Sequence, residues 1–202
     1  MKQNIIFDFG NVLGCFSTDC LTAPYVDTEE ERIQIRDVVF DRLYWDQLDR
    51  GMITDEEVID GVCSRLPKTL HRKAATVYQN WINSMTPVPL MTSLVHELKA
   101  KGHKLYLLSN ISIGFAEMYH TVPWIRSLFE QFDGLVFSGT VHMAKPDIEI
   151  FEYLLNQFQL KAEDCVFIDD NYDNVSGAKQ VGIEGYFFDQ DVKKLRDFLE
   201  LQ

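Results

Sequence analysis

The chain has 202 residues and a formal net charge of −12, from 31 acidic and 19 basic residues. Its length suffices for one sizeable hydrophobic core, or for one core that carries a smaller lobe. The negative charge and the lack of a long Lys/Arg run argue against a nucleic-acid partner, because nucleic-acid binders need a basic face. No segment approaches the ~20 apolar residues that span a bilayer, and the first residues do not resemble a signal segment. We therefore expect no membrane partner and a cytoplasmic location.

The cysteine pattern agrees with that location. The four cysteines are Cys15, Cys20, Cys63 and Cys165, and no two have C-x-x-C spacing. We expect free thiols in a reducing compartment. A redox or metal pair of Cys15 and Cys20 is the alternative, but no His or Cys cluster follows to complete such a site.

An apolar run near the N-terminus leads into an acidic residue. Two isoleucines and a phenylalanine precede Asp8, which is followed by a turn signal at Gly10 and Asn11. This pattern predicts a buried strand over residues 4–9. A carboxylate at the end of a buried strand costs free energy unless it is paired or bound to a metal. Asp8 is therefore a candidate nucleophile, and a turn or helix cap is the simpler alternative.

The next segment, residues 16–86, has helical periodicity throughout. The pattern predicts helices over residues 27–49, from residue 54 onward, and over residues 68–84. Thr54 begins a capping-box pattern before the second of these. Two prolines just after residue 86 close the helical segment.

Strands and helices alternate in the rest of the chain. We expect strands at residues 104–108, 134–137, 165–168 and 183–188, with helices at 90–101, 147–159, 175–181 and 192–201. Such alternation predicts an α/β fold with a doubly wound, Rossmann-like parallel sheet. The predicted core is residues 1–15 with 87–202, and residues 16–86 form an inserted all-helical cap. Ligands of such sheets bind beyond the carboxyl ends of the strands, so the cap would cover the site.

Polar residues follow the predicted strands at that same edge. They are Asp8, Ser109, Asn110, Lys145 in a loop, and the adjacent pair Asp169 and Asp170. Taken singly, Ser109 or Asn110 can cap the next helix, and Lys145 can be a solvated surface lysine. The adjacent acids are a stronger signal, because crowded like charges disfavour ionisation.

Together these groups form a recognisable chemical set. Carboxylates and a backbone carbonyl are the hard oxygen ligands that Mg²⁺ prefers. A lysine and a serine hydroxyl can hold phosphoryl oxygens, and a carboxylate beside a divalent cation is a competent nucleophile toward phosphorus. The set indicates phosphoryl transfer through an aspartyl-phosphate.

Four motifs strongly resemble the haloacid dehalogenase (HAD) superfamily, within it the phosphatase-like members that have a helical cap. The resemblance covers essentially the whole chain, and it is strongest to the subgroup with an Asp-Leu-Gly-Asn-Val motif, which includes alpha-glucose-1-phosphate phosphatase-like proteins. The matching motifs are Phe7-Asp8-Phe9-Gly10-Asn11-Val12-Leu13, Leu107-Leu108-Ser109-Asn110, Lys145-Pro146-Asp147, and Phe167-Ile168-Asp169-Asp170 with Asn174.

The resemblance implies a Mg²⁺-dependent phosphatase of a small phosphorylated metabolite, such as a sugar phosphate, acting as a monomer or homodimer. It implies Asp8 and Lys145 as catalytic residues. It also implies three further sets of residues: Asp8, the Gly10 backbone oxygen and Asp170 for the metal, Ser109, Asn110 and Lys145 for the phosphoryl group, and Asp169 with Asn174 in support.

One position departs from the family pattern. Most phosphatases of the superfamily have an acid–base aspartate two residues after the nucleophile, where this chain has Gly10. General acid–base catalysis typically contributes ~10²–10⁴-fold. Either only esters with good leaving groups are hydrolysed, or a cap residue or His142 supplies the proton, or catalysis is lost and phosphometabolite binding remains.

Two further alternatives stay open. A metal-independent 2-haloacid dehalogenase also lacks an acid at the Gly10 position, but a metal-free site has little use for the crowded Asp169 and Asp170. In the cap, Tyr44, Trp45, Asp49 and Arg50 precede a Gly51 turn and can face a substrate. We expect Tyr44 and Trp45 in the core of the cap, so the predicted site contains no cap residue.

Overall fold

A parallel sheet of five strands organises the molecule, and the computed structural model describes residues 2–201. The strand order is β5-β4-β1-β6-β7. The strands are β1 (Asn4–Phe7), β4 (Lys104–Ser109), β5 (Gly134–Phe137), β6 (Cys165–Asp169) and β7 (Glu184–Phe187). β1 lies between β4 and β6, and every pairing in this sheet is parallel. The predicted doubly wound sheet is confirmed.

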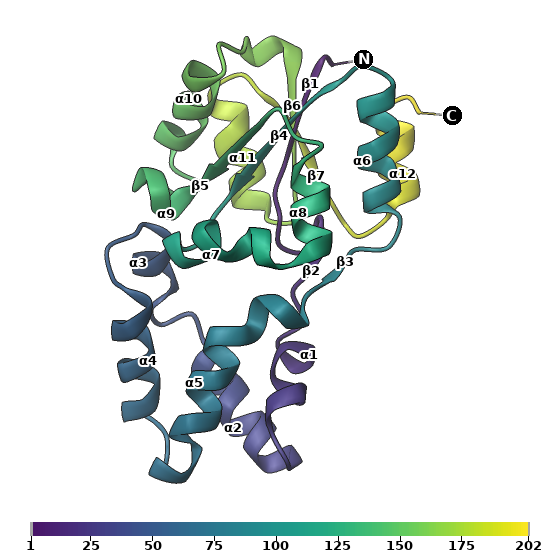
Figure 1. The fold of residues 1–202 in the computed structure, drawn as a ribbon. Coiled ribbons are helices and arrows are strands. Elements are labelled where there is room, and N and C mark those ends of the chain that lie inside the picture. Colours follow the sequence, from purple (N-terminus) through teal and green to yellow (C-terminus); the bar gives the residue numbers. More distant parts are fainter. Residues whose placement is uncertain (1, 202) are drawn as a thin grey trace.

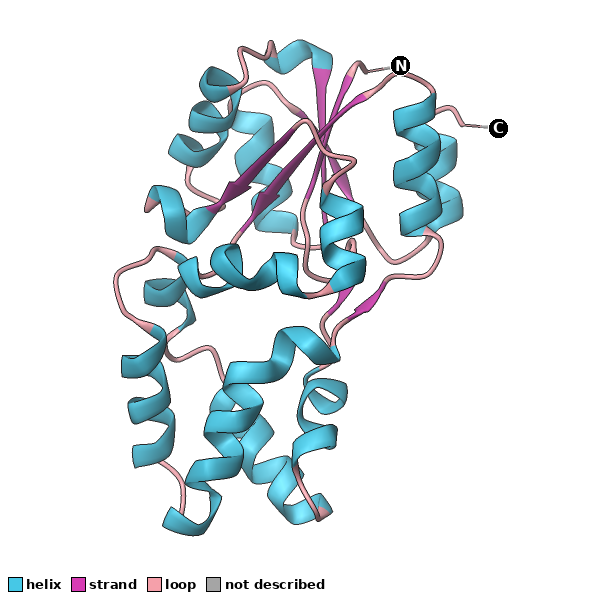
Figure 2. Ribbon diagram, viewed as in Figure 1, coloured by secondary structure: helices cyan, strands magenta, loops and turns pink. Residues whose placement is uncertain are grey.

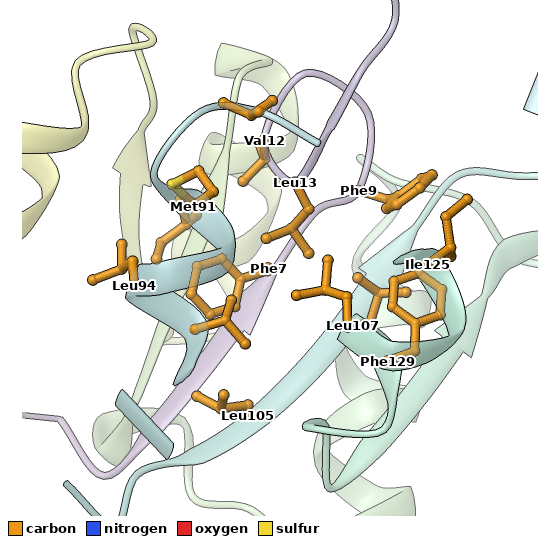
Figure 3. Close-up of a cluster of buried hydrophobic side chains, with 14 of the residues drawn as sticks. Phe7, Phe9, Val12, Leu13, Met91, Leu94, Leu105, Leu107, Ile125 and Phe129 are labelled. Atoms are coloured by element: carbon orange, nitrogen blue, oxygen red, sulfur yellow. The ribbon is translucent and has the colours of Figure 1, made fainter. Parts of the chain in front are cut away.

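The sheet is buried on both faces, as a parallel sheet requires. Successive residues of β1 alternate between the two faces, so Ile5 and Phe7 contact one set of helices and Ile6 the other. The first set is α6 (Met91–Ala100), α8 (Pro123–Phe129) and α12 (Val192–Phe198). The second is α10 (Ile148–Gln157) and α11 (Tyr172–Gln180). Figure 3 shows the first face, with Phe7 and Leu105 packed near Met91 and Leu94.

A separate bundle of helices follows β1 and lies at the carboxyl end of the sheet (Figures 1 and 2). Its elements are α1 (Thr18–Thr22), η1 (Ala23–Tyr25), α2 (Glu29–Val39), α3 (Trp45–Asp49), α4 (Asp55–Ser64), η2 (Lys68–Leu70), α5 (His71–Asn80) and η3 (Trp81–Ser84). The bundle has its own buried core, which includes Ile35, Val58 and Val77. A short antiparallel pair, β2 (Gly14–Cys15) and β3 (Thr86–Pro87), carries the chain out of the core and back. The domain limits at residues 15/16 and 86/87 stay a prediction.

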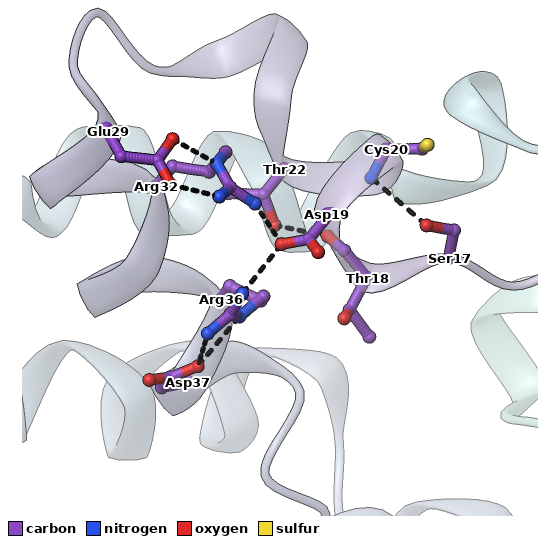
Figure 4. A network of polar contacts seen from close by, with 9 residues as sticks. All are labelled: Ser17, Thr18, Asp19, Cys20, Thr22, Glu29, Arg32, Arg36 and Asp37. Carbon is purple, nitrogen blue, oxygen red and sulfur yellow. Dashed lines mark hydrogen bonds and ion pairs between the residues drawn. The ribbon is translucent and has the colours of Figure 1, made fainter.

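Caps and ion pairs explain the local helix starts in this cap. Thr54 and Glu57 form the capping box that the sequence predicts at the start of α4. Figure 4 shows Asp19 of α1 paired with both Arg32 and Arg36 of α2, the latter at 2.8 Å. These pairs connect α1 to α2, and surface salt bridges of this kind contribute little to stability.

The predicted helix over residues 27–49 is wrong as one element. It breaks after α2, and α3 begins only at Trp45, because Arg42 adopts a left-handed conformation with φ 67°. The break turns both Phe40 and Trp45 toward Phe16. Several short elements were also not predicted: α1, β2, β3 and α9 (Ser138–Val141). The remaining helical segments are α7 (Ile113–Met118), η4 (Tyr119–Thr121) and η5 (Ala162–Asp164).

Within residues 2–201, no helix has both the length and the apolar character that crossing a bilayer requires.

Close packing of α11 against the Lys145 loop gives a test of this fold. A Cβ atom at Gly177 of α11 would lie 2.4 Å from the Pro146 carbonyl oxygen. We expect Gly177→Val to lower the free energy of unfolding by about 1–3 kcal/mol, because backbone must move to relieve the overlap. Urea unfolding measures the loss, and exposed Gln180→Val on the same helix is the matched control. Equal stability of the two variants would contradict the packing described here.

Candidate active site

The carboxyl ends of the central strands bring the predicted site residues to one place. Asp8 follows β1, Asp169 ends β6, and Ser109 ends β4. β1 and β6 are neighbours whose chains leave in opposite directions across the sheet, which is the switch point where α/β proteins bind ligands. A cavity of about 800 Å³ opens there. Seven of the predicted residues line it: Asp8, Gly10, Ser109, Asn110, Lys145, Asp170 and Asn174.

Lys145 is the centre of the charge arrangement. Its ammonium lies 2.7 Å from Asp8 Oδ1 and 2.7 Å from Asp169 Oδ2. Only 1% of its side chain is exposed, so a solvated surface lysine is excluded. A buried ammonium between two carboxylates compensates charges that would each be expensive alone.

Asp169 is fully occupied by hydrogen bonds beneath the cavity. Its Oδ1 accepts from the Asn171 backbone N–H at 2.7 Å and from Asn174 Nδ2 at 3.1 Å. Its Oδ2 accepts from Asn174 Nδ2 at 3.0 Å and from the Lys145 ammonium. Asp169 does not line the cavity. The geometry therefore suits Asp169 to holding Lys145 in place, in line with the predicted supporting role.

Asn110 joins β4 to the loop that carries Lys145. Its Nδ2 donates to the Lys145 carbonyl at 2.8 Å, and its Oδ1 accepts from the Lys145 backbone N–H at 2.8 Å. Neither Ser109 nor Asn110 caps the next helix, because Ser112 is the N-cap of α7. Ser109 is buried at the cavity wall. Contact of Ser109 and Asn110 with a phosphoryl group stays a prediction.

Burial is the largest single influence on the pKa values of Asp8, Asp170 and Lys145. It raises the pKa of the Asp8 carboxyl, and the neighbouring Lys145 opposes that shift while Asp169 adds to it. Burial also raises the pKa of Asp170, again with help from Asp169. For Lys145, burial acts to lower the pKa, but the two carboxylates outweigh it and raise the pKa overall. The site thus has a shortage of positive charge beside three acids.

The donor set fits a hard divalent cation. Asp8, Asp169 and Asp170 each offer a carboxylate oxygen, and these atoms lie within 4.8 Å of one another. Because Asp169 is already saturated by its own hydrogen bonds, Asp8 and Asp170 are the acids left to bind a metal. Oxygen-rich, partly hydrated sites of this kind suit Mg²⁺.

The cap supplies cavity-lining residues that lie outside the predicted site. Four aromatic rings form a cluster on that wall, with Phe16 in edge contact with each of the others at centroid distances of 5.3–5.8 Å. This aromatic cluster is Phe16, Phe40, Trp45 and Trp81, and all four line the cavity. Trp45, expected in the core of the cap, faces the site instead. Arg42, Asp49 and Tyr78 line it as well.

His142, one of the candidates to supply a proton to the leaving group, lies outside the cavity. Its Nδ1 donates to the Arg50 carbonyl at 3.0 Å, and it does not line the cavity. Arg50 also pairs with Asp147 at 2.8 Å. His142 and Asp147 therefore belong to the contact between cap and core, which leaves His142 away from any leaving group.

A family model, haloacid dehalogenase-like hydrolase, matches residues 4–182. The chain belongs to this family. The recognition made from its motifs is confirmed at the level of the family, while the subgroup stays a prediction.

Individual relatives in the haloacid dehalogenase-like family align over most of the chain. A sesquiterpene phosphatase of Aspergillus oryzae is 31% identical over 182 residues, 89% of this chain and 86% of that protein. A D-ribitol-5-phosphate phosphatase of Bacteroides thetaiotaomicron is 24% identical over 92% of this chain and 91% of that protein. A HAD family enzyme from the same bacterium, solved as an Asp-to-Ala mutant with magnesium and inorganic phosphate, has a TM-score of 0.69. Its identity is 20%, over 93% of this chain and 94% of that one.

The buried lysine of this haloacid dehalogenase-like site can be tested through stability. We expect Lys145→Met to lower the free energy of unfolding by about 3–5 kcal/mol without divalent metal, because two buried carboxylates lose their counter-ion. Burial then raises the pKa of Asp8 still further above its unfolded value, so the loss grows as pH rises from 5 to 8. Urea unfolding with EDTA measures it.

The control is Lys194→Met, which removes an ammonium from a side chain that is 62% exposed. It should change stability by less than about 0.5 kcal/mol. A Lys145→Met variant as stable as this control at pH 8 would show that the buried triad is not structurally important.

Proposed function

We propose that this protein is a Mg²⁺-dependent phosphatase that works through a phospho-Asp8 intermediate. The observation that carries the proposal is the Asp8 carboxylate at the switch point. The buried Lys145 ammonium contacts one of its oxygens, and a second acid, Asp170, lies beside it. Lys145 donates to Oδ1, and the Phe9 backbone N–H also donates to this carboxylate, which would attack phosphorus. The nucleophile is thereby oriented by contacts that exist before substrate binds.

The metal would be held by Asp8, Asp170 and the Gly10 carbonyl, and when bound it would offset the negative charge that gathers on the phosphoryl oxygens. Lys145 and the Ser109 hydroxyl bind the remaining phosphoryl oxygens. Asn110 keeps the Lys145 backbone in place during this work. Such a site acts mostly through positioning and charge stabilisation.

The comparisons support this proposal. Two aligned relatives are phosphatases by name, and a protein of the same fold was solved with magnesium and phosphate. The dehalogenase alternative has less support, because a metal-free attack of Asp8 on carbon has little use for the crowded acids Asp169 and Asp170 beside it. A binder without catalysis stays the second candidate, since Gly10 carries no acid.

The lining of the cavity favours a substrate whose alcohol part is apolar. The aromatic cluster covers the cap wall with half-buried rings, and apolar surface of this kind gains about 25 cal/mol per Å² when a ligand covers it. The sesquiterpene phosphatase of Aspergillus oryzae is the relative that fits such a wall. A sugar phosphate, expected from the resemblance, is the competing substrate class. A monomer or homodimer and a cytoplasmic location complete the proposal.

Replacing the nucleophile tests the reaction type. We expect Asp8→Asn to reduce turnover of p-nitrophenyl phosphate with Mg²⁺ by about 10³-fold or more, because an amide cannot form the phosphoenzyme. Asp189→Asn, which alters an exposed acid paired with Lys194, is the control and should keep wild-type turnover. Full activity of Asp8→Asn would remove Asp8 as nucleophile. No turnover of any phosphate ester by the wild type with Mg²⁺ would favour the binder.

A second test addresses the substrate class. We expect Trp45→Ala to lower kcat/KM for a sesquiterpenyl monophosphate by about tenfold or more, because truncating a large ring removes roughly 1.5–3 kcal/mol of apolar contact. Inhibition by inorganic phosphate should not change. Leu43→Ala, at an exposed cap position outside the cavity, is the control. If glucose 1-phosphate or ribitol 5-phosphate is hydrolysed far better than the apolar ester, the apolar class is wrong.

A further inference from the structure

The space above Gly10 is empty. A Cβ atom built there meets nothing within 4 Å, and Gly10 lines the cavity. Transfer of a phosphoryl group from an alkyl ester to Asp8 expels an alkoxide, which is a poor leaving group until it gains a proton. The core side of the cavity offers Asp8, Asp170 and Lys145, which are committed to the nucleophile, the metal and the phosphoryl group. Tyr172 and Asp173 also line it, but both side chains are exposed to solvent. A more buried acid elsewhere in the cavity is the better source of the proton.

Asp49 is one of two carboxyl groups on the cap wall of the cavity, and Asp46 is the other. Asp49 is the last residue of α3, it is half-buried, and it lines the same cavity as Asp8 and Lys145. Within residues 2–201, no hydrogen bond or ion pair reaches its carboxyl group. Two nearby acids of the cap differ in this respect, since Asp46 pairs with Arg50 at 3.1 Å and Asp55 accepts from the Tyr78 hydroxyl at 2.7 Å.

The end of α3 is held against the core by specific contacts. The residue after Asp49 is Arg50, whose carbonyl accepts from His142 and whose guanidinium pairs with Asp147. Gly51 follows with φ 63°, and a Cβ there would lie 2.5 Å from the Gly139 carbonyl oxygen. The backbone next to Asp49 is therefore docked on the rim of the site. A half-buried, unpartnered carboxyl at a docked position is costly to stability and suited to chemistry.

We propose that Asp49 is the general acid and base of the reaction and supplies from the cap what Gly10 lacks; this inference rests on the proposed phosphatase function. In the first step a carboxylate oxygen of Asp8 bonds to phosphorus, the ester P–O bond breaks, and the departing oxygen takes the proton of Asp49. In the second step a water attacks phospho-Asp8 and gives its proton to the Asp49 carboxylate. The Asp8–phosphorus bond breaks, and inorganic phosphate leaves with both residues restored.

The surroundings of Asp49 keep its proton available near neutral pH. Burial raises the pKa of the Asp49 carboxyl to about 7. Arg42, from the loop before α3, and Lys145, from the core, oppose the shift, whereas Asp46 and Asp8 add to it. The Tyr78 hydroxyl of α5 faces the same region, and its pKa is raised by burial, by Asp55 and in part by Asp49. A cation beside Asp8 would favour the charged form of Asp49, so the pH profile is measured with Mg²⁺ present.

The decisive experiment compares leaving groups in Asp49→Asn. The substrates are n-octyl phosphate, which releases a poor leaving group, and p-nitrophenyl phosphate, which releases a good one. The comparison uses kcat/KM, because this constant reports only the steps up to and including formation of phospho-Asp8, in which the leaving group departs. We expect a loss of about 10²–10⁴-fold for the octyl ester and of less than about tenfold for the nitrophenyl ester. The wild-type octyl profile should fall as pH rises past about 7, where Asp49 loses its proton, and that fall should vanish in the variant.

Four measurements separate this role from a structural one. Asp60→Asn, at an exposed position of α4 outside the cavity, should lose less than about threefold on either ester. Asp49→Asn should bind inorganic phosphate with Mg²⁺ like the wild type in calorimetry. At pH 8, Asp49→Asn should also be at least as stable as the wild type. The pKa of Asp49 is higher in the folded than in the unfolded protein, so ionisation of Asp49 costs the wild type stability as pH rises, and the amide removes that cost. Asp49→Glu should recover part of the octyl activity.

Equal losses on both esters, or an unchanged octyl rate, would refute the acid role of Asp49. The proposed phosphatase function would fail by a different result, in which the wild type hydrolyses neither ester with Mg²⁺.

Discussion

The ammonium of Lys145, buried between Asp8 and Asp169, is the interaction on which the rest of the site depends. Each of the three charges would be prohibitive alone in this setting, and each is tolerable because of the others. The surrounding hydrogen bonds serve the same end: Asn110 fixes the lysine backbone, while Asn174 and a backbone N–H saturate Asp169. Asp8 and Asp170 have fewer hydrogen bonds than Asp169 and line the cavity, which is where the chemistry is proposed.

Much of this arrangement can be predicted from the sequence, because the ends of the buried strands are marked by polar residues. Short apolar runs that stop at Asp8, Ser109 and Asp169 predict both the strands and the edge at which their polar neighbours meet. The motif predicts Lys145 as a site residue but not its burial, since no local sequence pattern shows that a lysine before a proline turns inward. The hydrogen bonds of Asn110 to the lysine backbone were equally invisible, because they join residues 35 positions apart.

The cap was less predictable for a physical reason. Helical periodicity ran through residues 27–49, and nothing in composition marked Arg42 as a left-handed residue. That one break rotates α3 and decides that Trp45 and Asp49 face the core domain instead of the cap interior. A signal existed in the unusual density of aromatic residues near the break, including Phe40, Tyr44 and Trp45, but periodicity assigned them to packing.

The docking of α3 has a consequence for the order of events on the protein. The chain passes between core and cap through the short strands β2 and β3, and α3 meets the core through Arg50, Gly51, His142 and Asp147. If the cap swings away to release alcohol or phosphate, those contacts separate together and Asp49 leaves with them. An open molecule would then hold its nucleophile and no proton donor, so opening and catalytic competence would be mutually exclusive. The cap movement that admits substrate would therefore also determine when the proton donor is in place.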